Sequence, residues 1–262
     1  MEQLGVLYYV SSFPKLSESF ILNEINELYN RGHNIAVFAQ SDPKENITHE
    51  EYEDIDVPIY YADVSYTDLP KLLSKIPAQM ALRNVTGGFF RYLSPKRIAQ
   101  NLLLGKQCAQ FIGALDFEID VVNAHFAHSS RIGATLAARH HGIPCTVTAH
   151  AFEIFRSPNV PQIKYICDSM DHVIVPSEYN QSYLRDEIGI ENDITVVPAT
   201  TQVEKFEPSA PTVENRLLTV ARLVEKKGYP YGIEAVNSLI ERGYVVEYHI
   251  VGTGDWKDRL QQ

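Results

Sequence analysis

The segment LGVLYYV (residues 4–10) is followed by SSFPKLS (11–17), ESFILNEINELYNR (18–31), Gly32, His33 and NIAVFA (34–39). The first and last runs are largely apolar, which is typical of strands buried on both faces. Between them, apolar residues at positions 20, 21, 25 and 28 follow helical spacing, with Ser17 as a suitable N-cap and Gly32 as a suitable end. This strand–helix–strand unit predicts an α/β fold around a parallel sheet.

The alternation of strands and helices continues downstream. Strand-like runs lie at 55–61, 121–124, 144–149, 171–176 and 194–197, and helical patterns lie at 67–115, 131–141 and 177–188. We therefore expect a Rossmann-like domain over residues 1–199. Residues 200–213 contain Pro208 and Pro211 and show little periodicity, so they are predicted to be a linker.

A second unit of the same kind begins after the linker. Residues 214–262 show a strand at 216–221, a helix at 231–242, a strand at 245–251 and a helix that starts at 255. A single strand–helix–strand unit is too small to have both faces of its parallel sheet covered. We therefore expect residues 214–262 to be an incomplete Rossmann-like domain.

Composition excludes some classes of protein. The net charge of −10 argues against nucleic-acid binding, which requires a basic face. Apolar runs fall short of the roughly 18 residues of a membrane span, and residues 4–10 lack the basic flank of a signal peptide. We expect a cytoplasmic protein and leave open a peripheral contact with the inner face of the membrane. The three cysteines lack metal or redox spacing, which predicts buried thiols.

A basic cluster in the mainly helical region has two interpretations. With neighbouring aromatic residues it could form an interfacial face for a lipid-linked acceptor. The favoured alternative is a solvated basic face on helices that cover the sheet. The residues concerned are Arg83, Phe89, Phe90, Arg91, Tyr92, Lys96, Arg97 and Lys106.

The run LLTVARLVEKKG (217–228) places Arg222 and Lys227 between the end of a strand and the start of a helix. Ligands of open α/β sheets bind at such places, and a helix N-terminus favours anions. A guanidinium and an ammonium there would form a clamp for a diphosphate. A solvated basic loop is the alternative. Gly252-x-Gly254, after the next strand, is a weak signal for a phosphate-binding loop.

Three predicted strands of the first domain end at Ser11, His125 and His150. Because parallel strands end at one edge of a sheet, these residues are expected to converge where a ligand binds. His125-x-x-His128 could be a metal pair, but it lacks a third acidic ligand on a helix, so a structural role is favoured. Solvated helix faces are the default interpretation for the carboxylates of Glu18, Glu24 and Glu153.

Four stretches together resemble the retaining GT-B glycosyltransferases of family GT4, in particular a colanic-acid-type exopolysaccharide subgroup. They are SFPKLSESFI (12–21), TAHAFEIF (148–155), VPATTQVEKF (197–206), and VARLVEKKG (220–228) with IVGTG (250–254). The third stretch departs from the family pattern, since Ala199–Gln202 replaces its Asn-Gly portion and Glu204 stands for its Asp. The family's E-x7-E segment is absent from residues 1–262, so the resemblance implies a truncated second domain.

The resemblance implies an activity and roles for residues. The enzyme would transfer a sugar, with retention, from a nucleoside-diphosphate-sugar to a glycan or lipid-linked acceptor. The catalytic residues would be His150, Arg222 and Lys227. Donor-diphosphate binding would fall to Arg222 and Lys227, supported by Gly252 and Gly254, and His150 would contact the donor sugar or the developing charge at the reacting carbon. The acceptor side would be formed by Ser17, Glu18 and His125. Because cationic side chains offset the charge, no metal and no cofactor are expected.

Two other classes stay open at this point. The chain could be a catalytically inactive fragment that acts as a binding or interaction module. It could also be a GT-B-like sugar-nucleotide epimerase, which would turn over the donor without any acceptor. The loop at Phe13-Pro14 and the segment 148–155 favour the transferase over the epimerase.

Overall fold

A computed structural model describes residues 2–44, 48–63, 91–156, 159–199, 203–206 and 211–261 of the chain. The chain divides into two compact units, Met1–Gln202 and Val203–Gln262. This division falls within residues 200–213, where the sequence predicts a linker.

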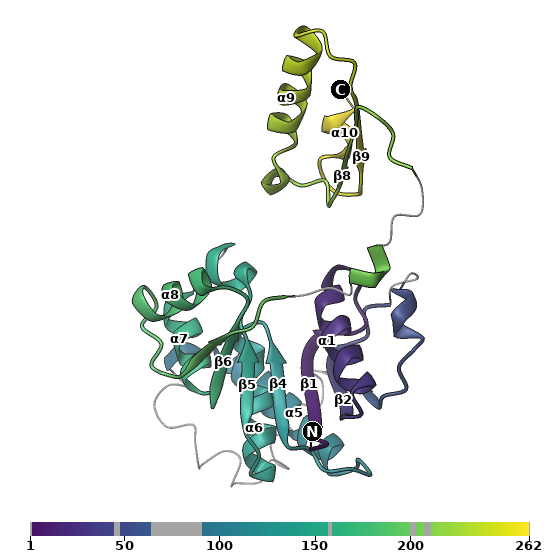
Figure 1. The fold of residues 1–262 in the computed structure, drawn as a ribbon. Helices are drawn as coiled ribbons and strands as arrows, with labels where there is room; N and C mark the ends of the chain where they lie inside the picture. Colours follow the sequence, from purple (N-terminus) through teal and green to yellow (C-terminus); the bar gives the residue numbers. More distant parts are fainter. Residues whose placement is uncertain are drawn as a thin grey trace. The chain divides into compact units, whose positions relative to one another are not determined.

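The first unit is built on a seven-stranded sheet in the order β3-β2-β1-β4-β5-β6-β7, in which every neighbouring pair is parallel (Figure 1). The strands are β1 (Gly5–Ser12), β2 (Asn34–Ser41), β3 (Ile59–Tyr61), β4 (Val121–His125), β5 (Cys145–Thr148), β6 (His172–Val175) and β7 (Ile194–Val196). The longer helices are α1 (Ser19–Asn30), α5 (Pro95–Ile112), α6 (Ile132–His141), α7 (Val160–Asp168) and α8 (Glu178–Asp186). Short 3-10 turns η1 (Leu16–Glu18), η2 (Glu50–Tyr52) and η4 (Ser129–Arg131) and the π-helix η5 (Phe152–Arg156) join them. The predicted α/β fold with a parallel sheet is confirmed.

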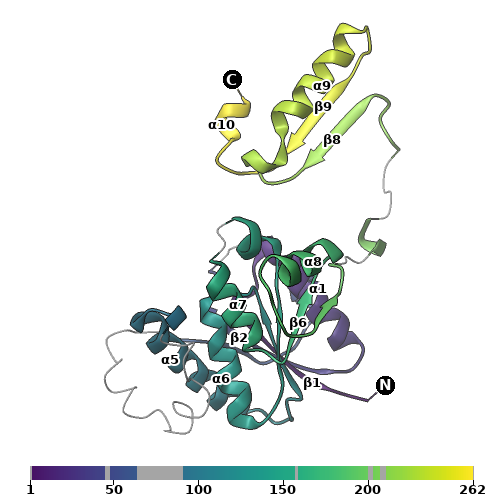
Figure 2. The ribbon, with the colours of Figure 1, turned by 90° about the vertical axis from the view of Figure 1, so that its left-hand side faces the viewer.

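Helices cover the two faces of this sheet unequally (Figure 2). Side chains alternate along each strand, so Leu7 and Tyr9 enter one core and Tyr8 and Val10 enter the other. The larger core receives apolar residues from α5, α6, α7 and α8. On the opposite face, α1 packs through Ile21, Leu22 and Ile25 over β1 and β2. On the face of the sheet that carries α1, the neighbouring strands β4 and β5 present mainly polar residues.

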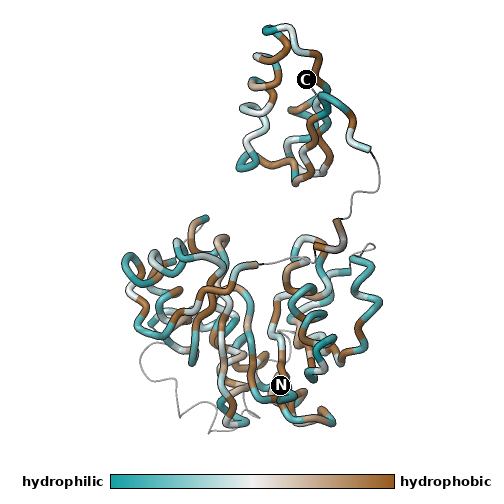
Figure 3. The backbone as a smooth tube through the Cα atoms, viewed as in Figure 1, coloured by the Kyte–Doolittle hydropathy of each residue, from teal (hydrophilic) through white to brown (hydrophobic). Residues whose placement is uncertain are grey.

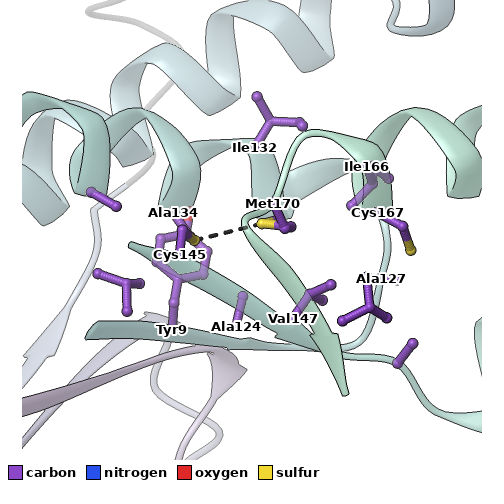
Figure 4. Packing of buried hydrophobic residues seen from close by; sticks show 14 of the residues in the cluster. Tyr9, Ala124, Ala127, Ile132, Ala134, Cys145, Val147, Ile166, Cys167 and Met170 are labelled. Atoms are coloured by element: carbon purple, nitrogen blue, oxygen red, sulfur yellow. Dashed lines mark hydrogen bonds between the residues drawn. The ribbon is translucent and has the colours of Figure 1, made fainter. Parts of the chain in front are cut away.

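All three cysteines are buried free thiols, as the sequence predicts. Cys145 lies on β5 in the larger core, where its Sγ is 3.5 Å from Sδ of Met170 (Figure 4). Burial raises the pKa of Cys145 to about 12, because the thiolate would lose its hydration there. These thiols are therefore packing groups rather than nucleophiles.

Local signals decide several helix ends. Ser177 caps α8 by accepting a hydrogen bond from the amide of Asn180 (3.2 Å), which confirms the predicted cap. Gly142 ends α6 with a φ of 72°, a backbone conformation that suits glycine. The predicted cap at Ser17 is wrong: Ser17 lies inside η1, and α1 begins at Ser19 without a side-chain cap. Helix α7 and the π-helix η5 were missed by the sequence analysis.

The second unit contains the parallel pair β8 (Arg216–Val220) and β9 (Glu247–Val251), joined by η7 (Glu225–Lys227) and α9 (Tyr229–Glu241). It also holds η6 (Val203–Phe206) and α10 (Lys257–Leu260). In Figure 3, α9 alternates between brown and teal, as an amphipathic helix does. The strand–helix–strand order matches the prediction. Among the helices within the described ranges, none has the length and apolar character that crossing a bilayer demands.

Candidate active site

The strand order reverses between β1 and β4, and the carboxyl ends of these strands lie side by side. Ser11 lies near the end of β1, His125 ends β4 and His150 comes two residues after β5. The register pairs His125 with Thr148 on β5. The prediction that these strand ends share one edge of the sheet is therefore confirmed. Such a switch point is where open α/β sheets bind ligands.

His125 and His150 form a stacked pair. The two rings lie 5.5 Å apart with an interplanar angle of 19°, and Nδ1 of His125 is 3.2 Å from Nε2 of His150. His125 is fully buried, whereas His150 is half-buried. The His150 ring is thus accessible to a ligand, whereas the His125 ring is covered, and the predicted contact of His125 with an acceptor stays a prediction.

Both imidazoles are held neutral. Burial lowers the pKa of His150 to about 4, because the charged ring would be poorly hydrated. The pKa of His125 falls well below its usual value through burial first, then through repulsion by His150 and Arg131. The ring of His150 packs on Phe20 and Phe126, with centroids 4.8 and 4.5 Å away. At neutral pH, His150 is thus an uncharged group that can donate or accept one hydrogen bond.

The backbone at Phe126 is unusual for an aromatic residue, with a φ of 67°. A non-glycine residue in this left-handed region is strained and persists where surrounding contacts hold it. Phe126 donates its amide to the carbonyl of Thr148 (2.9 Å) and accepts from the amide of His128 (2.8 Å). These bonds fix the turn after β4 in the conformation that brings the Phe126 ring against His150.

Glu24 projects from α1 toward the histidine pair. Its Oε1 accepts hydrogen bonds from the Tyr8 hydroxyl (2.8 Å) and from Nδ2 of Asn123 (3.3 Å), and its Oε2 lies 3.8 Å from Nε2 of His125. Burial raises the pKa of Glu24, and the two hydrogen bonds oppose that rise. Glu24 is exposed, with 42% of its side chain accessible, so the expected solvated carboxylate is found, and the two hydrogen bonds also hold it in place.

A cavity of about 280 Å³ opens between α1 and the ends of β5, β6 and β7. Its apolar wall includes Phe20, Leu28, Ile174, Pro176 and Val197. The polar lining consists of Asn23, Glu24, Glu27, Thr148 and His150, and no Lys or Arg occurs among the described residues around it. An anionic ligand would meet two carboxylates there. The cavity therefore suits an uncharged ligand.

Glu153, on the π-helix η5, holds the two loops of the site together. Its Oε1 accepts from the amide of His150 (2.6 Å) and from the amide of Ala127 (2.9 Å). The residue is buried, and burial raises its pKa while the backbone hydrogen bonds oppose the rise. The expectation of a solvated helix face is wrong for Glu153. The loops after β4 and β5 are instead joined through one carboxylate.

Arg131 braces the neighbouring strand ends from inside the protein. Its Nη2 donates to Oγ of Ser11 (2.7 Å), its Nε donates to the carbonyl of His125, and the guanidinium lies over the Tyr9 ring at 5.7 Å. Nε2 of His128 lies 3.5 Å from the same Ser11 hydroxyl. Within the described ranges, no group of three His, Cys, Asp or Glu side chains is arranged to hold a metal ion.

Ser17 and Glu18 occupy the turn η1 before α1. Ser17 is exposed, and Glu18 is paired with Lys15 at 2.7 Å. Oε2 of Glu18 is buried without a hydrogen-bond partner among the described residues. The cavity at His150 receives its α1 residues from Phe20 onward, so neither residue of η1 lines it. Their predicted contact with an acceptor stays a prediction.

In the second unit, Arg222 and Lys227 lie on the loop between β8 and α9, as predicted. Both side chains are exposed, and neither has an ion-pair partner within the described residues. The loop is well held: the buried Tyr229 donates its hydroxyl toward the carbonyls of Ala221 (3.1 Å) and Arg222 (2.9 Å). Their predicted binding of a donor diphosphate stays a prediction.

Gly252 and Gly254 let two loops of the second unit pack closely. A Cβ on Gly252 would lie 1.9 Å from the carbonyl oxygen of Ala221, and one on Gly254 would lie 2.4 Å from that of Leu223. The amide of Leu223 donates to the carbonyl of Thr253 (2.8 Å), which ties the loops together. These close contacts explain on structural grounds why both positions are glycine. Their predicted contact with a donor stays a prediction.

The model of Glycosyltransferase Family 4 matches residues 17–204, which include His125, His150 and Glu153. The chain belongs to Glycosyltransferase Family 4. It is 26% identical, over 98% of its length, to the "Putative colanic acid biosynthesis glycosyltransferase WcaL" of Escherichia coli K12, and the same identity relates it to the protein of that name from Salmonella typhimurium. The chain spans 66% of the length of these curated relatives.

Solved structures show the same fold. A glycosyltransferase from Rickettsia africae superposes with a TM-score of 0.62 at 13% identity, covering 100% of this chain and 63% of its own. TarM superposes with a TM-score of 0.65 at 11% identity, covering 99% of this chain and 74% of its own. These likenesses place this Family 4 member among GT-B folds, which agrees with the Rossmann-like architecture that the sequence predicts.

Several residues of this Family 4 site were missed by the sequence analysis. Asn123 lies within the predicted strand 121–124, Arg131 begins the predicted helix 131–141, and Tyr229 precedes the predicted helix 231–242. The alternation of side chains along 121–125 does place Asn123 on the same face as His125. For Arg131 and Tyr229 the sequence carries no comparable signal, since their partners lie on other elements of the fold.

Proposed function

We propose that the protein is a glycosyltransferase that moves a sugar from a nucleoside-diphosphate-sugar to a glycan or lipid-linked acceptor, with retention of configuration, in polysaccharide biosynthesis. Membership of Glycosyltransferase Family 4 supports the reaction class. The names of the relatives at 26% identity support the biosynthetic role. Because the chain spans 66% of those relatives, the activity is proposed for the protein with a whole second domain.

The exposed cations of the second unit carry this proposal. Breaking a glycosyl–phosphate bond places negative charge on the departing diphosphate, and preorganised cations stabilise that charge. Arg222 and Lys227 have no carboxylate partner among the described residues, so their charges are available to a ligand. The Tyr229 hydroxyl and the amide of Leu223 fix the backbone of their loop, which limits the reorganisation needed on binding.

The charges around the cavity of the first unit argue against a diphosphate binding there. Glu24 and Glu27 line it, and an anion would be repelled there. We assign the diphosphate to Arg222 and Lys227 and an uncharged sugar to the neighbourhood of His150. A neutral His150 can then hold a sugar hydroxyl by a hydrogen bond, while Phe20 and Phe126 exclude water from its other side.

We further propose that transfer requires no metal, since Arg222 and Lys227 supply the positive charge at the diphosphate. Activity in the presence of a strong chelator tests this directly. Turnover that falls to background with the chelator and returns with a divalent cation would show that the two side chains are insufficient.

A peripheral membrane contact is a secondary proposal. Arg91, Lys96 and Arg97 are exposed, Lys106 is half-buried, and the Arg91 guanidinium lies over the Tyr92 ring at 5.6 Å. The structure does not describe Arg83 of this cluster or its aromatic neighbours Phe89 and Phe90. Co-sedimentation with anionic liposomes at low salt tests the contact. Protein that stays in the supernatant removes the proposal.

The deciding experiment is turnover of a panel of nucleoside-diphosphate-sugars with and without acceptors, with NMR of the product's anomeric centre. Release of nucleoside diphosphate that depends on an acceptor, with the donor's configuration retained, supports the transferase. Conversion of the donor without acceptor identifies an epimerase instead. Calorimetric titration with nucleoside diphosphates that gives no heat points to an interaction module.

A further inference from the structure

We infer that Asn123 sets the tautomer of His150 through His125, so that His150 offers an Nδ1–H donor to the cavity. Asn123 is thereby a positioning residue: it touches no ligand and acts through the buried ring between it and His150. The inference rests on three consecutive contacts in the first unit: the first has a defined donor, and the donors of the other two follow from it.

The first contact fixes which way the amide of Asn123 faces. Its Nδ2 lies 3.3 Å from Oε1 of Glu24, which already accepts from the Tyr8 hydroxyl at 2.8 Å. A carboxylate oxygen can only accept, so the group that faces it must be the NH2. The Oδ1 then faces the other way and accepts from the hydroxyls of Thr146 (3.0 Å) and Thr148 (3.3 Å). All polar groups of Asn123 are satisfied in this orientation.

The second contact determines which ring nitrogen of His125 is protonated. The remaining N–H of the Asn123 amide lies toward Nε2 of His125, with a nitrogen–nitrogen distance of 3.4 Å. Nε2 must therefore accept, and the proton of the neutral ring resides on Nδ1. Oε2 of Glu24, the other polar atom near Nε2, is 3.8 Å away and too distant to hold a proton there by a hydrogen bond.

The third contact determines which ring nitrogen of His150 is protonated. Nδ1–H of His125 donates to Nε2 of His150 across 3.2 Å, so the proton of His150 lies on its own Nδ1. Nδ1 of His150 has no hydrogen-bond partner within the described residues, and the residue lines the cavity. His150 is therefore set to donate to a ligand oxygen rather than to remove a proton.

The inferred tautomer follows from contacts within the protein alone. Its use, a hydrogen bond to a sugar oxygen, rests on the proposed function. The tautomer can be measured on the whole chain without any substrate, so failure of the inference and failure of the proposed activity are distinguishable.

The experiment is long-range proton–nitrogen NMR of the 262-residue chain with 15N-labelled histidine rings at neutral pH. Signals of His150 are assigned by their loss in His150→Gln. The expected result is a protonated Nδ1 and an unprotonated Nε2 for both His125 and His150. A protonated Nε2 on His150, or a doubly protonated ring, would overturn the inference.

A charge-conserving exchange tests the role of Asn123. The double variant Glu24→Gln/Asn123→Asp places an acceptor opposite Nε2 of His125 and keeps one carboxylate in the cluster. The protons of both rings are expected to move from Nδ1 to Nε2. Unchanged His150 signals in the folded double variant would show that Asn123 does not set the tautomer, and if that variant does not fold, Asn123→Leu should lose the single tautomer instead.

Thr195→Val is the matched control on the same face of the sheet. Its hydroxyl lies 2.7 Å from Nε2 of His172, so the signals of His172 should move. Those of His125 and His150 should stay where they are in the parent protein. Movement of the His150 signals in this control would mean that its tautomer responds to changes anywhere on this face of the sheet and not to Asn123 in particular, which would also overturn the inference.

Discussion

The carboxylate of Glu153 accepts the backbone amide of His150 at 2.6 Å, and the same oxygen accepts the amide of Ala127 at 2.9 Å. One buried side chain thus connects the loops that follow β4 and β5. His150 is held from two directions, through its backbone by Glu153 and through its ring by His125. The position of this histidine therefore depends on residues of several elements along this edge of the sheet.

Replacing Glu153 by Leu should destabilise the first unit by about 2–4 kcal/mol, because two buried amides lose their acceptor. Glu153→Gln is the matched variant, since its carbonyl oxygen can accept from both amides while the charge is removed. We expect the Gln variant to lose less than half as much. Urea unfolding followed by far-UV circular dichroism measures both, and equal losses would mean that the negative charge matters rather than the acceptor.

Arg222→Ala should weaken transition-state binding of the donor by about 2–5 kcal/mol if the guanidinium holds the diphosphate in a desolvated complex. Lys226→Ala is the control, because Lys226 is an exposed cation on the same loop. The measurement is kcat/KM for the donor in a protein that carries a whole second domain. An Arg222 variant within twofold of the parent would remove this residue from the site.

Tyr229→Phe should destabilise the second unit by about 1–2 kcal/mol, since the carbonyls of Ala221 and Arg222 lose their shared donor. The control Tyr231→Phe changes an exposed side chain and should stay within about 0.5 kcal/mol. Trp256, the single tryptophan, donates its amide to Leu223 of the same loop region and reports unfolding by fluorescence. Equal effects of the two variants would show that the Tyr229 hydroxyl does not brace the loop.

Stability should fall as the pH is lowered from about 6.5 toward 4. Burial lowers the pKa of His150 from 6.5 to about 4 and that of His128 from 6.5 to about 3. Between the pKa of the unfolded chain and that of the folded chain, each histidine is protonated in the unfolded state and neutral in the folded state, so the unfolded state binds more protons. Each group therefore contributes stability that is present above pH 6.5 and lost on acidification. The raised pKa values of Glu24 and Glu153 act in the opposite direction.

His150→Gln isolates one of these contributions. The slope of unfolding free energy against pH between 6.5 and 4 should decrease by up to about 1.4 kcal/mol per pH unit, the value for one proton. Urea unfolding at a series of pH values measures it. Parallel curves for the parent and the variant across this range would contradict a lowered pKa at His150.

The sequence alone determined the element order, most strand positions and the loop that carries Arg222 and Lys227. Such features depend on periodicities of two or 3.6 residues, which are local and visible in a linear pattern. The short helix α7 was missed because nine residues give little room for a helical periodicity to show, and Pro161 lies near its start. The cap at Ser17 failed because η1 places the turn there in a different geometry.

The tertiary structure alone decided which polar residues act together. His125 and His150 meet because β4 and β5 pair in one particular register, and Arg131 reaches Ser11 across 120 positions of sequence. A buried Arg or Glu cannot be distinguished from a solvated one in a linear pattern, because its desolvation is offset by partners on distant elements. Local chemistry thus set the elements, and the pairing of strands far apart in the chain set the site.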